Sequence, residues 1–230
     1  MKISFYGAAQ GVTGSNFLVD TNGTQILIDC GLHQEGSFCE PRNAGTFPYD
    51  PKRIAALCIT HAHLDHIGRI PKLVKEGFIG KIIATAPTFE LMMLTLQDTI
   101  HIIEGKEDED CPTVFTEEDL HHVEELFVPT RYGETVTVAD GVRVTLTDAG
   151  HVLGSAMVAI EGEGKRVVCT GDVGNAPTPL LNDPTPLGRA DAVVIDSTYG
   201  GRNHEDRANR RLVLERTIED IVTRRGVLMI

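Results

Sequence analysis

The chain has 230 residues, of which 41% are hydrophobic and 23% are charged, a balance that is ordinary for a globular protein. No apolar run reaches the ~20 residues that a membrane span needs, and Lys2 is not followed by the apolar segment of a signal peptide. The formal net charge of −12 argues against a general nucleic-acid coat held by bulk charge. A metal centre or a local basic groove would still allow contact with nucleic acid.

The cysteines favour a reducing compartment. There are five of them, an odd number, and no two form a C-x-x-C pair. Cys58 and Cys169 lie in apolar runs and are expected in the core. We therefore expect a soluble, cytoplasmic protein without membrane contact.

The first part of the chain predicts strands at residues 2–6, 15–19 and 25–29, with a glycine-rich loop at 7–14. The loop lacks the spacing of a dinucleotide-binding fingerprint. An Asn-Gly pair at 22–23 indicates a hairpin between the second and third strands. Asp29 ends the third strand and is either a turn former or an acceptor for a metal-ligating histidine.

Residues 30–50 form a long loop with few periodic apolar positions, and a loop of this length is often functional. His33 and Cys39 lie in it. The favoured interpretation of His33 is a solvated side chain.

A dense polar motif follows the apolar run 54–59, which predicts a buried strand. The motif is H-x-H-x-D-H, formed by His61, His63, Asp65 and His66. The apolar spacing of the following residues indicates a helix, so the motif lies where a strand ends and a helix begins. Imidazole and carboxylate together suit Zn, Fe or Mn. The alternative is a histidine-rich surface loop without a ligand.

The middle of the chain predicts a strand at 81–85, a helix from Pro87 to about residue 104, and a second helix from Thr116 to about residue 127. The acidic run within 105–112 is expected to be a solvated loop. His121 and His122 are adjacent and point to different faces of the second helix, where they are expected to be surface or packing residues.

Beyond residue 134 the pattern changes to strands, expected at 134–138, 141–147, 155–160, 166–170 and 192–195. Three polar residues follow ends of these strands: His151, Asp172 and Asp196. Residues 175–188 form a proline-rich connector. The last elements are a long helix at 204–225 and a buried strand at 226–230.

These residues can be grouped around two metals. His61, His63 and His151 can serve one ion. Asp65 and His66 can serve a second, with Asp172 bridging the pair. Two ions about 3.5–4 Å apart would share a hydroxide and clamp a substrate oxygen.

The sequence here resembles the metallo-β-lactamase superfamily, and specifically its β-CASP branch of RNA-processing nucleases, of the ribonuclease J and cleavage-and-polyadenylation endonuclease type. H-x-H-x-D-H by itself indicates only the superfamily, whereas G-H-x-L-G-S and D-S-T-Y-G indicate the branch. The matching segments are G-A-A-Q-G-V-T-G-S at 7–15, I-D-C-G at 28–31, T-H-A-H-L-D-H-I-G-R at 60–69, D-A-G-H-V-L-G-S at 148–155, T-G-D-V-G at 170–174 and D-S-T-Y-G-G-R at 196–202.

The resemblance implies an α/β fold, the αββα metallo-β-lactamase sandwich, incomplete at the C-terminus. Residues 1–196 would be the N-terminal part of that domain, and 197–230 a connector helix and first strand leading into a missing β-CASP domain. In the family, later segments supply two more histidines, one a ligand of the second metal and one a general acid. We therefore expect these residues to be the N-terminal part of a longer protein, weakly active or inactive alone.

The resemblance also implies site roles. It places Asp29, the 61–66 motif, His151 and Asp172 at the metal site, and it makes Asp196 an acidic residue supporting the catalytic centre. Arg202 and His204 match the following segment, where structural and substrate-side roles are both open.

The expected function is metal-dependent hydrolysis of RNA phosphodiesters by a metal-bridging hydroxide, with Asp65 orienting or deprotonating the water and with 5′-phosphate and 3′-hydroxyl products. Two divalent transition-metal ions are implied, Zn being favoured over Mn. The partner is RNA, with single-stranded DNA as an alternative, and homo-oligomerisation and endo- or exonuclease action are left open. Two other hypotheses are a small-molecule ester, thioester or lactam hydrolase on the same fold, and a non-catalytic scaffold subunit.

Overall fold

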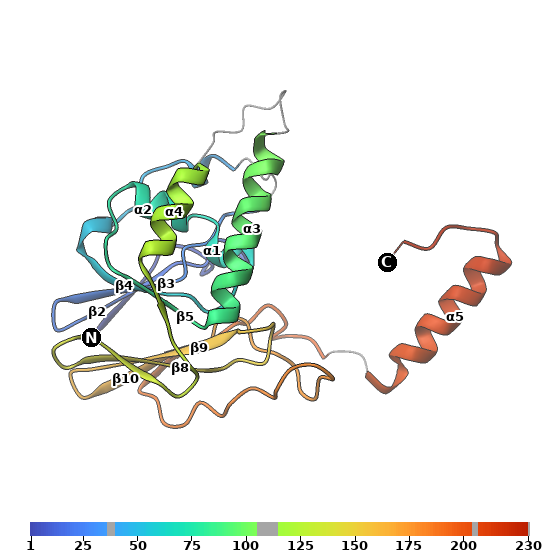
Figure 1. Ribbon diagram of the computed structural model, residues 1–230. Helices are drawn as coiled ribbons and strands as arrows, with labels where there is room; N and C mark the ends of the chain where they lie inside the picture. Colours follow the sequence, from blue (N-terminus) through green and yellow to red (C-terminus); the bar gives the residue numbers. More distant parts are fainter. Residues whose placement is uncertain (36–39, 105–114, 204–206, 230) are drawn as a thin grey trace. The chain divides into compact units, whose positions relative to one another are not determined.

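The computed structural model describes residues 1–35, 40–104, 115–203 and 207–229 (Figure 1). Cys39, the acidic run within 105–112 and His204 lie outside these ranges. The chain divides into two units, Met1–Asp196 and Ser197–Ile230, and each is described by itself. That residues 197–230 lead into a further domain stays a prediction.

The first sheet is built from six strands in chain order, with its N-terminal half antiparallel and its other half parallel. Asn22 and Gly23 join the second and third strands with left-handed φ angles of 54° and 71°, the conformation that a tight hairpin turn requires. The hairpin prediction is confirmed. The strands are β1 (Lys2–Phe5), β2 (Phe17–Thr21), β3 (Thr24–Ile28), β4 (Ile54–Cys58), β5 (Lys81–Ala84) and β6 (Phe127–Pro129).

Four helices pack on one face of this sheet (Figure 1). Pro71 and Pro87 lie in the first turns of two of them, where the missing N–H of proline costs nothing. The N–H of Thr116 donates to the Asp119 carboxylate over 2.9 Å and so caps a third. These helices are α1 (Leu64–Ile67), α2 (Ile70–Lys75), α3 (Ala86–Glu104) and α4 (Glu117–Glu125). None of the helices in the described ranges is long and apolar enough to cross a membrane.

The second sheet has five strands in the order β11-β10-β9-β8-β7, all antiparallel except for the parallel pair β10 and β11. It packs on the other face of the first sheet (Figure 1). Its strands are β7 (Thr135–Ala139), β8 (Val142–Asp148), β9 (Ala156–Gly162), β10 (Lys165–Cys169) and β11 (Ala192–Val194). The expected α/β class is confirmed.

The alternation of side chains along the central strands divides the core in two. In β3, Ile26 and Ile28 point to the second sheet, whereas Leu27 points to the helices. All three are fully buried, because the sheet is covered on both faces. This explains why the strand is a continuous apolar run rather than an alternating one.

The expected fourth layer is not formed by the described part of residues 1–196. The outer face of the second sheet there carries coil, with Leu187 and Ala190 packed on Met157 and Val168. An outer helical layer therefore stays a prediction.

Two sequence-based expectations about elements were wrong. The helix after Thr116 ends at Glu125, and Phe127–Pro129 forms strand β6, because pairing with β5 satisfies its backbone. Residues 226–229 are coil, with Val227 and Met229 87% and 91% exposed. No described strand pairs with them, and an apolar segment without a partner strand cannot form a ladder.

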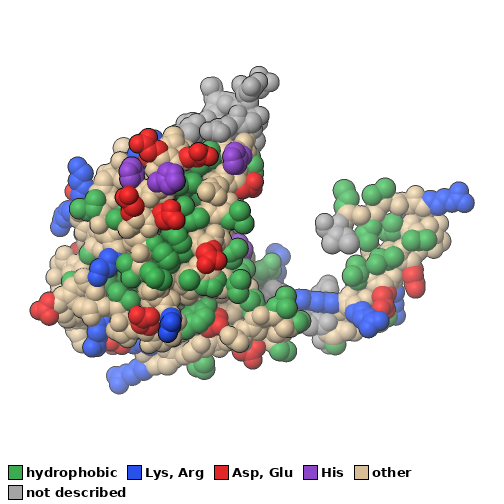
Figure 2. Space-filling model, viewed as in Figure 1, with side chains coloured by type: hydrophobic (Ala, Val, Ile, Leu, Met, Phe, Trp, Pro, Cys, Tyr) green, Lys and Arg blue, Asp and Glu red, His purple; other side chains and the backbone are tan. Residues whose placement is uncertain are grey.

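The second unit contains the 3-10 turn Arg207–Asn209 and helix α5 (Arg210–Thr223). No described side chain of α5 is buried. Figure 2 shows apolar side chains along this unit. Leu212 and Val222 are among the exposed apolar residues of α5.

Gly31 follows strand β3 and lies very close to the backbone of Asp65 and His66. Its N–H donates to the Ser15 carbonyl over 2.9 Å, and the N–H of Cys30 donates to the His66 carbonyl over 2.8 Å. A Cβ atom on Gly31 would lie 1.5 Å from the carbonyl oxygen of Asp65. Only glycine allows the two segments to lie this close.

We predict that Gly31→Ala lowers the free energy of unfolding by about 1–3 kcal/mol, because the backbone of Asp65 must move. Urea denaturation followed by circular dichroism measures the change. Gly45→Ala is the matched control, since its added Cβ would meet only an ordinary contact at 3.5 Å. Equal stability of the two variants would contradict the proposed close approach.

Candidate metal centre

Both sheets contribute side chains to one cluster. Strands β3 and β4 are parallel, so their carboxyl ends lie at the same edge, where Asp29 and His61 follow them. His151 lies in the connection between β8 and β9, and Asp172 follows β10. The cluster therefore joins residues separated by more than a hundred positions in the chain.

The polar motif turns directly into a helix. His63 has an extended backbone and is the N-cap residue of α1, so Asp65 and His66 lie in the first turn. An acidic side chain is favourable near a helix N-terminus. The turn directs His61 and His66 inward, where both are buried, and leaves His63 exposed.

Four potential ligand atoms, one each from His61, His63, His151 and Asp172, lie within 4.8 Å of one another. His63 Nδ1 is 2.9 Å from His61 Nε2 and 3.3 Å from His151 Nε2. Asp172 Oδ2 is 3.7 Å from His61 Nε2 and 3.4 Å from His151 Nε2. Tetrahedral bonds to Zn of about 2.0–2.1 Å place ligand atoms about 3.3 Å apart. The donor spacing therefore fits a tetrahedral transition-metal ion.

Asp172 also faces a second group of donors. Its Oδ1 atom is 3.4 Å from His66 Nε2, and Asp65 Oδ2 is 3.8 Å from the same nitrogen. Each oxygen of Asp172 thus points to a different set of side chains. This is the arrangement that a bridging carboxylate between two ions requires.

Asp29 lies behind the cluster and fixes the orientation of His66. Its fully buried carboxylate is 2.7 Å from His66 Nδ1, and it accepts hydrogen bonds from the Ser15 hydroxyl at 3.1 Å and from the Thr60 N–H at 2.8 Å. Because Nδ1 is held by Asp29, the other ring nitrogen faces Asp172. Of the two interpretations left open for Asp29, the geometry favours the acceptor for a histidine.

The protonation states suit metal ligation on the first group of donors. Burial is the main cause that lowers the pKa of His61 and of His151, so both imidazoles are neutral near pH 7. The pKa of Asp172 is lowered because hydrogen bonding and charge attraction by His66 outweigh its burial. Neutral imidazoles with an ionised carboxylate are the donor forms that Zn or Mn binds.

The second group of donors, Asp65 and His66, differs from the first group in its pKa shifts. Burial alone would lower the pKa of His66, but the carboxylates of Asp29 and Asp172 outweigh it and raise the pKa to about 10. Burial raises the pKa of Asp65. Three acidic side chains around one imidazole make this a site for positive charge.

Of the remaining predicted residues, Asp196 belongs to the first unit and Arg202 to the second. Asp196 follows β11, its N–H donates to the Thr170 hydroxyl over 3.2 Å, and its charge acts to raise the pKa of His151. It therefore lies close enough to act electrostatically on the cluster. Arg202 is exposed in the second unit, and its structural or substrate-side role stays a prediction.

Three polar residues near the site were not anticipated. Ser15 and Thr60 hold Asp29, and their positions beside the glycine-rich loop and beside His61 were the available signal. His33 was expected to be solvated, which is wrong: the residue is 7% exposed. Its backbone is held by reciprocal hydrogen bonds with the buried Asn43 side chain, of 2.8 and 2.9 Å, which draw it inward.

The family model of the metallo-β-lactamase superfamily matches residues 9–218. Ribonuclease TTHA0252 of Thermus thermophilus is 40% identical over 208 residues, covering 89% of this chain and 45% of that protein. Cleavage and polyadenylation specificity factor subunit 3 of Dictyostelium discoideum is 31% identical over 240 residues, covering 100% of this chain and 30% of that protein. The chain thus spans less than half the length of these relatives.

Among solved structures, a Cronobacter sakazakii metallo-β-lactamase HARLDQ motif mutant, S60, has a TM-score of 0.51 at 21% identity, covering 79% of this chain and 64% of that one. This likeness supports the fold alone. The two relatives above confirm the resemblance to the RNA-processing branch. With the family match across most of its length, the chain belongs to the metallo-β-lactamase superfamily.

Proposed function

We propose that this chain carries the metal centre of a β-CASP-type ribonuclease, a metal-dependent phosphodiester hydrolase. The observation that carries the proposal is the set of His61, His63, His151 and Asp172 donors within 4.8 Å. Similarity to a ribonuclease and to a cleavage and polyadenylation factor supports RNA as the substrate. The chain covers under half of these relatives, so the proposal concerns the longer protein of which this chain would be a part.

The site would hold two divalent transition-metal ions, with Zn favoured at the nitrogen-rich position. His61, His63, His151 and Asp172 would hold the first ion. Asp65 and His66 would hold the second, with Asp172 shared. When bound, such ions lower the pKa of water and offset charge on phosphoryl oxygens.

The protein side chains then have separate tasks in hydrolysis. Asp65, half-buried at the cluster, would orient the attacking water and accept its proton. Asp29 would keep His66 oriented as a ligand of the second ion through the 2.7 Å contact. Asp196 would act on His151 through its charge. Attack of water on phosphorus would break the P–O3′ bond, and the leaving 3′-oxygen would take its proton from the general-acid histidine that the resemblance places in the longer protein. The products would carry 5′-phosphate and 3′-hydroxyl ends.

We predict that freshly purified protein contains bound transition metal, and that His61→Ala/His63→Ala removes the ion held at that position. Elemental analysis by mass spectrometry measures the metal content. His121→Ala/His122→Ala is the matched control, because both residues are exposed on α4. Absence of metal from the wild-type protein would favour a non-catalytic scaffold instead.

We predict that Asp29→Asn weakens metal binding about 10- to 100-fold, because the partner that orients His66 loses its charge. Competition with a chromogenic chelator measures the affinity. Asp140→Asn, on an exposed turn, controls for the loss of one surface charge. An unchanged affinity in Asp29→Asn would show that His66 needs no such partner.

We predict that the longer protein cleaves end-labelled RNA, and that chelator abolishes the cleavage. Asp65→Asn should lower the rate constant about 10²- to 10⁴-fold if Asp65 takes the proton. Electrophoresis of the labelled products measures rates and end chemistry. Cleavage that survives both chelation and His61→Ala/His63→Ala would refute the proposal.

A further inference from the structure

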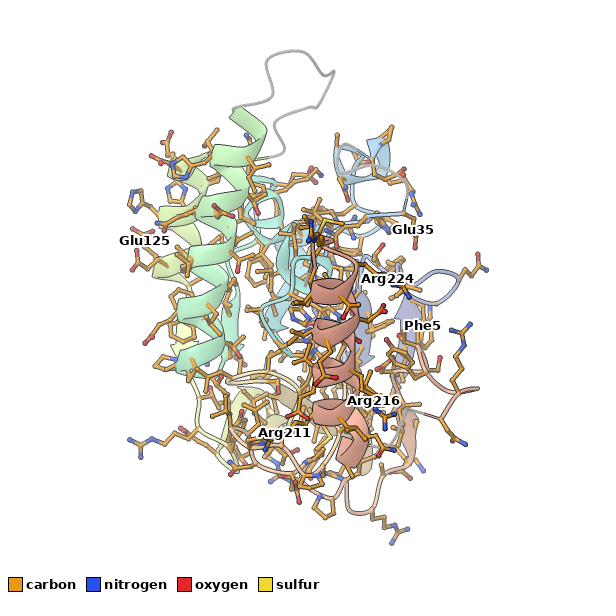
Figure 3. All side chains as sticks on the ribbon, turned by 90° about the vertical axis from the view of Figure 1, so that its right-hand side faces the viewer. Phe5, Glu35, Glu125, Arg211, Arg216 and Arg224 are labelled. Carbon is orange, nitrogen blue, oxygen red and sulfur yellow. The ribbon has the colours of Figure 1, made fainter. Side chains whose placement is uncertain are left out.

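A cavity of about 590 Å³ lies beside the glycine-rich loop and is separate from the metal-ligand cluster. Its size is within the ~300–1,000 Å³ range of small-molecule sites. Its lining includes Phe5, His33, Glu35 and Arg42. In Figure 3, Phe5 and Glu35 lie toward the same side of the first unit.

One wall of the cavity offers an exposed aromatic ring. Phe5 is 50% exposed although it lies in strand β1. Phe17 packs against it edge-to-face, with ring centroids 5.4 Å apart, so the ring is held in place. A fixed and accessible ring is a platform on which a planar ligand can stack.

The polar chemistry comes from Arg42, which two carboxylates share: Glu35, and Glu40, whose Oε1 atom lies 3.0 Å from Arg42 Nε. Arg42 Nη2 lies 2.7 Å from Glu35 Oε2, and the side chains are 51% and 36% exposed. Glu35 Oε1 accepts one long hydrogen bond of 3.5 Å from the Thr13 N–H and has no other hydrogen-bond partner in the described part of the chain. Glu35, Arg42 and Glu40 together offer donors and acceptors with one net negative charge, which favours a neutral polar ligand over a phosphate.

His33 adds a buried polar group at the same cavity. It is 7% exposed, and its Nδ1 atom has no hydrogen-bond partner within the described part of the chain. Its ring lies against Gly14, where a Cβ atom would approach Nδ1 to 2.3 Å. The glycine-rich loop therefore closes on His33 and shapes the cavity.

The loop also connects the cavity to the metal centre. Gly14 is followed by Ser15, whose N–H donates to the Asp65 carbonyl over 2.8 Å and whose hydroxyl donates to Asp29. On the other side, the N–H of Leu32, next to His33, donates to the Leu64 carbonyl over 3.0 Å. Both segments that form the cavity are thus anchored beside Asp65.

From this geometry we infer that the cavity is a subsite for one unpaired nucleobase of the substrate strand, stacked on Phe5 and hydrogen-bonded by the Glu35–Arg42 pair. A nucleobase is planar and neutral and carries both donors and acceptors, and every base has a face that can stack. The inference rests on the proposed function, because it assumes that the strand reaching the metal centre is RNA.

The test uses the full chain in chelator, so that binding is measured without hydrolysis. Short single-stranded oligoribonucleotides with one abasic position, moved along the strand, are titrated by fluorescence anisotropy. We expect one abasic position to weaken binding by the wild-type chain about tenfold. Phe5→Ala should weaken binding of the intact strand by a similar factor and should remove the effect of that abasic position. Glu35→Gln should weaken binding severalfold.

Matched controls are Ile79→Ala, an exposed apolar position, and Glu125→Gln, which Figure 3 places on the opposite side of the unit from Glu35. Phe5→Leu keeps apolar bulk without the ring and should behave as Phe5→Ala, provided that its circular dichroism spectrum is native. The inference is overturned if the wild-type chain does not bind the strand, or if Phe5→Ala and Phe5→Leu retain the abasic effect. If Phe5→Ala and Phe5→Leu retain the abasic effect, the longer protein could still show chelator-sensitive cleavage of RNA. That result would overturn the base subsite and leave the proposed ribonuclease function intact.

Discussion

The buried carboxylate of Asp29 is the interaction on which the arrangement of the site depends. It is fully buried, which would be costly for a charge without partners. Ser15, Thr60 and His66 supply those partners, and they belong to the loop before β2, the end of β4 and helix α1. One carboxylate therefore holds three separate segments in register, and a shift of any of them would leave its charge unsatisfied.

The metal-ligand cluster also requires that the two sheets pack closely against each other. Asp172 and His151 come from the second sheet, whereas His61 and His63 come from the first. The apolar cluster between the sheets, which includes Ile26, Ile28 and Val158, fixes their separation. Hydrophobic burial, which is not directional, thus supplies the stability, and the hydrogen bonds of Asp29 supply the orientation.

Much of the fold could be predicted because its elements have strong local signals. The β2–β3 hairpin followed from an Asn-Gly turn, and α3 followed from a proline at its first turn and a long apolar pattern. Strand β6 was missed because it has three residues, and its strand character comes from pairing with β5. The burial of His33 was missed for a similar reason, since the Asn43 side chain that holds it lies ten residues away, in the short 3-10 helix Pro41–Asn43.

From the residues alone, the chemistry of the site could be anticipated: the H-x-H-x-D-H motif at the end of a strand predicts imidazole and carboxylate donors, a set that suits a transition-metal ion. The division of these donors into two groups depends on the tertiary structure. The tertiary structure placed His151 with His61 and His63, directed the two oxygens of Asp172 to different groups, and set Asp29 behind His66. The physical reason is that spacing along a chain fixes which donors are neighbours on one turn, whereas distances between donors on different strands depend on how the sheets pack.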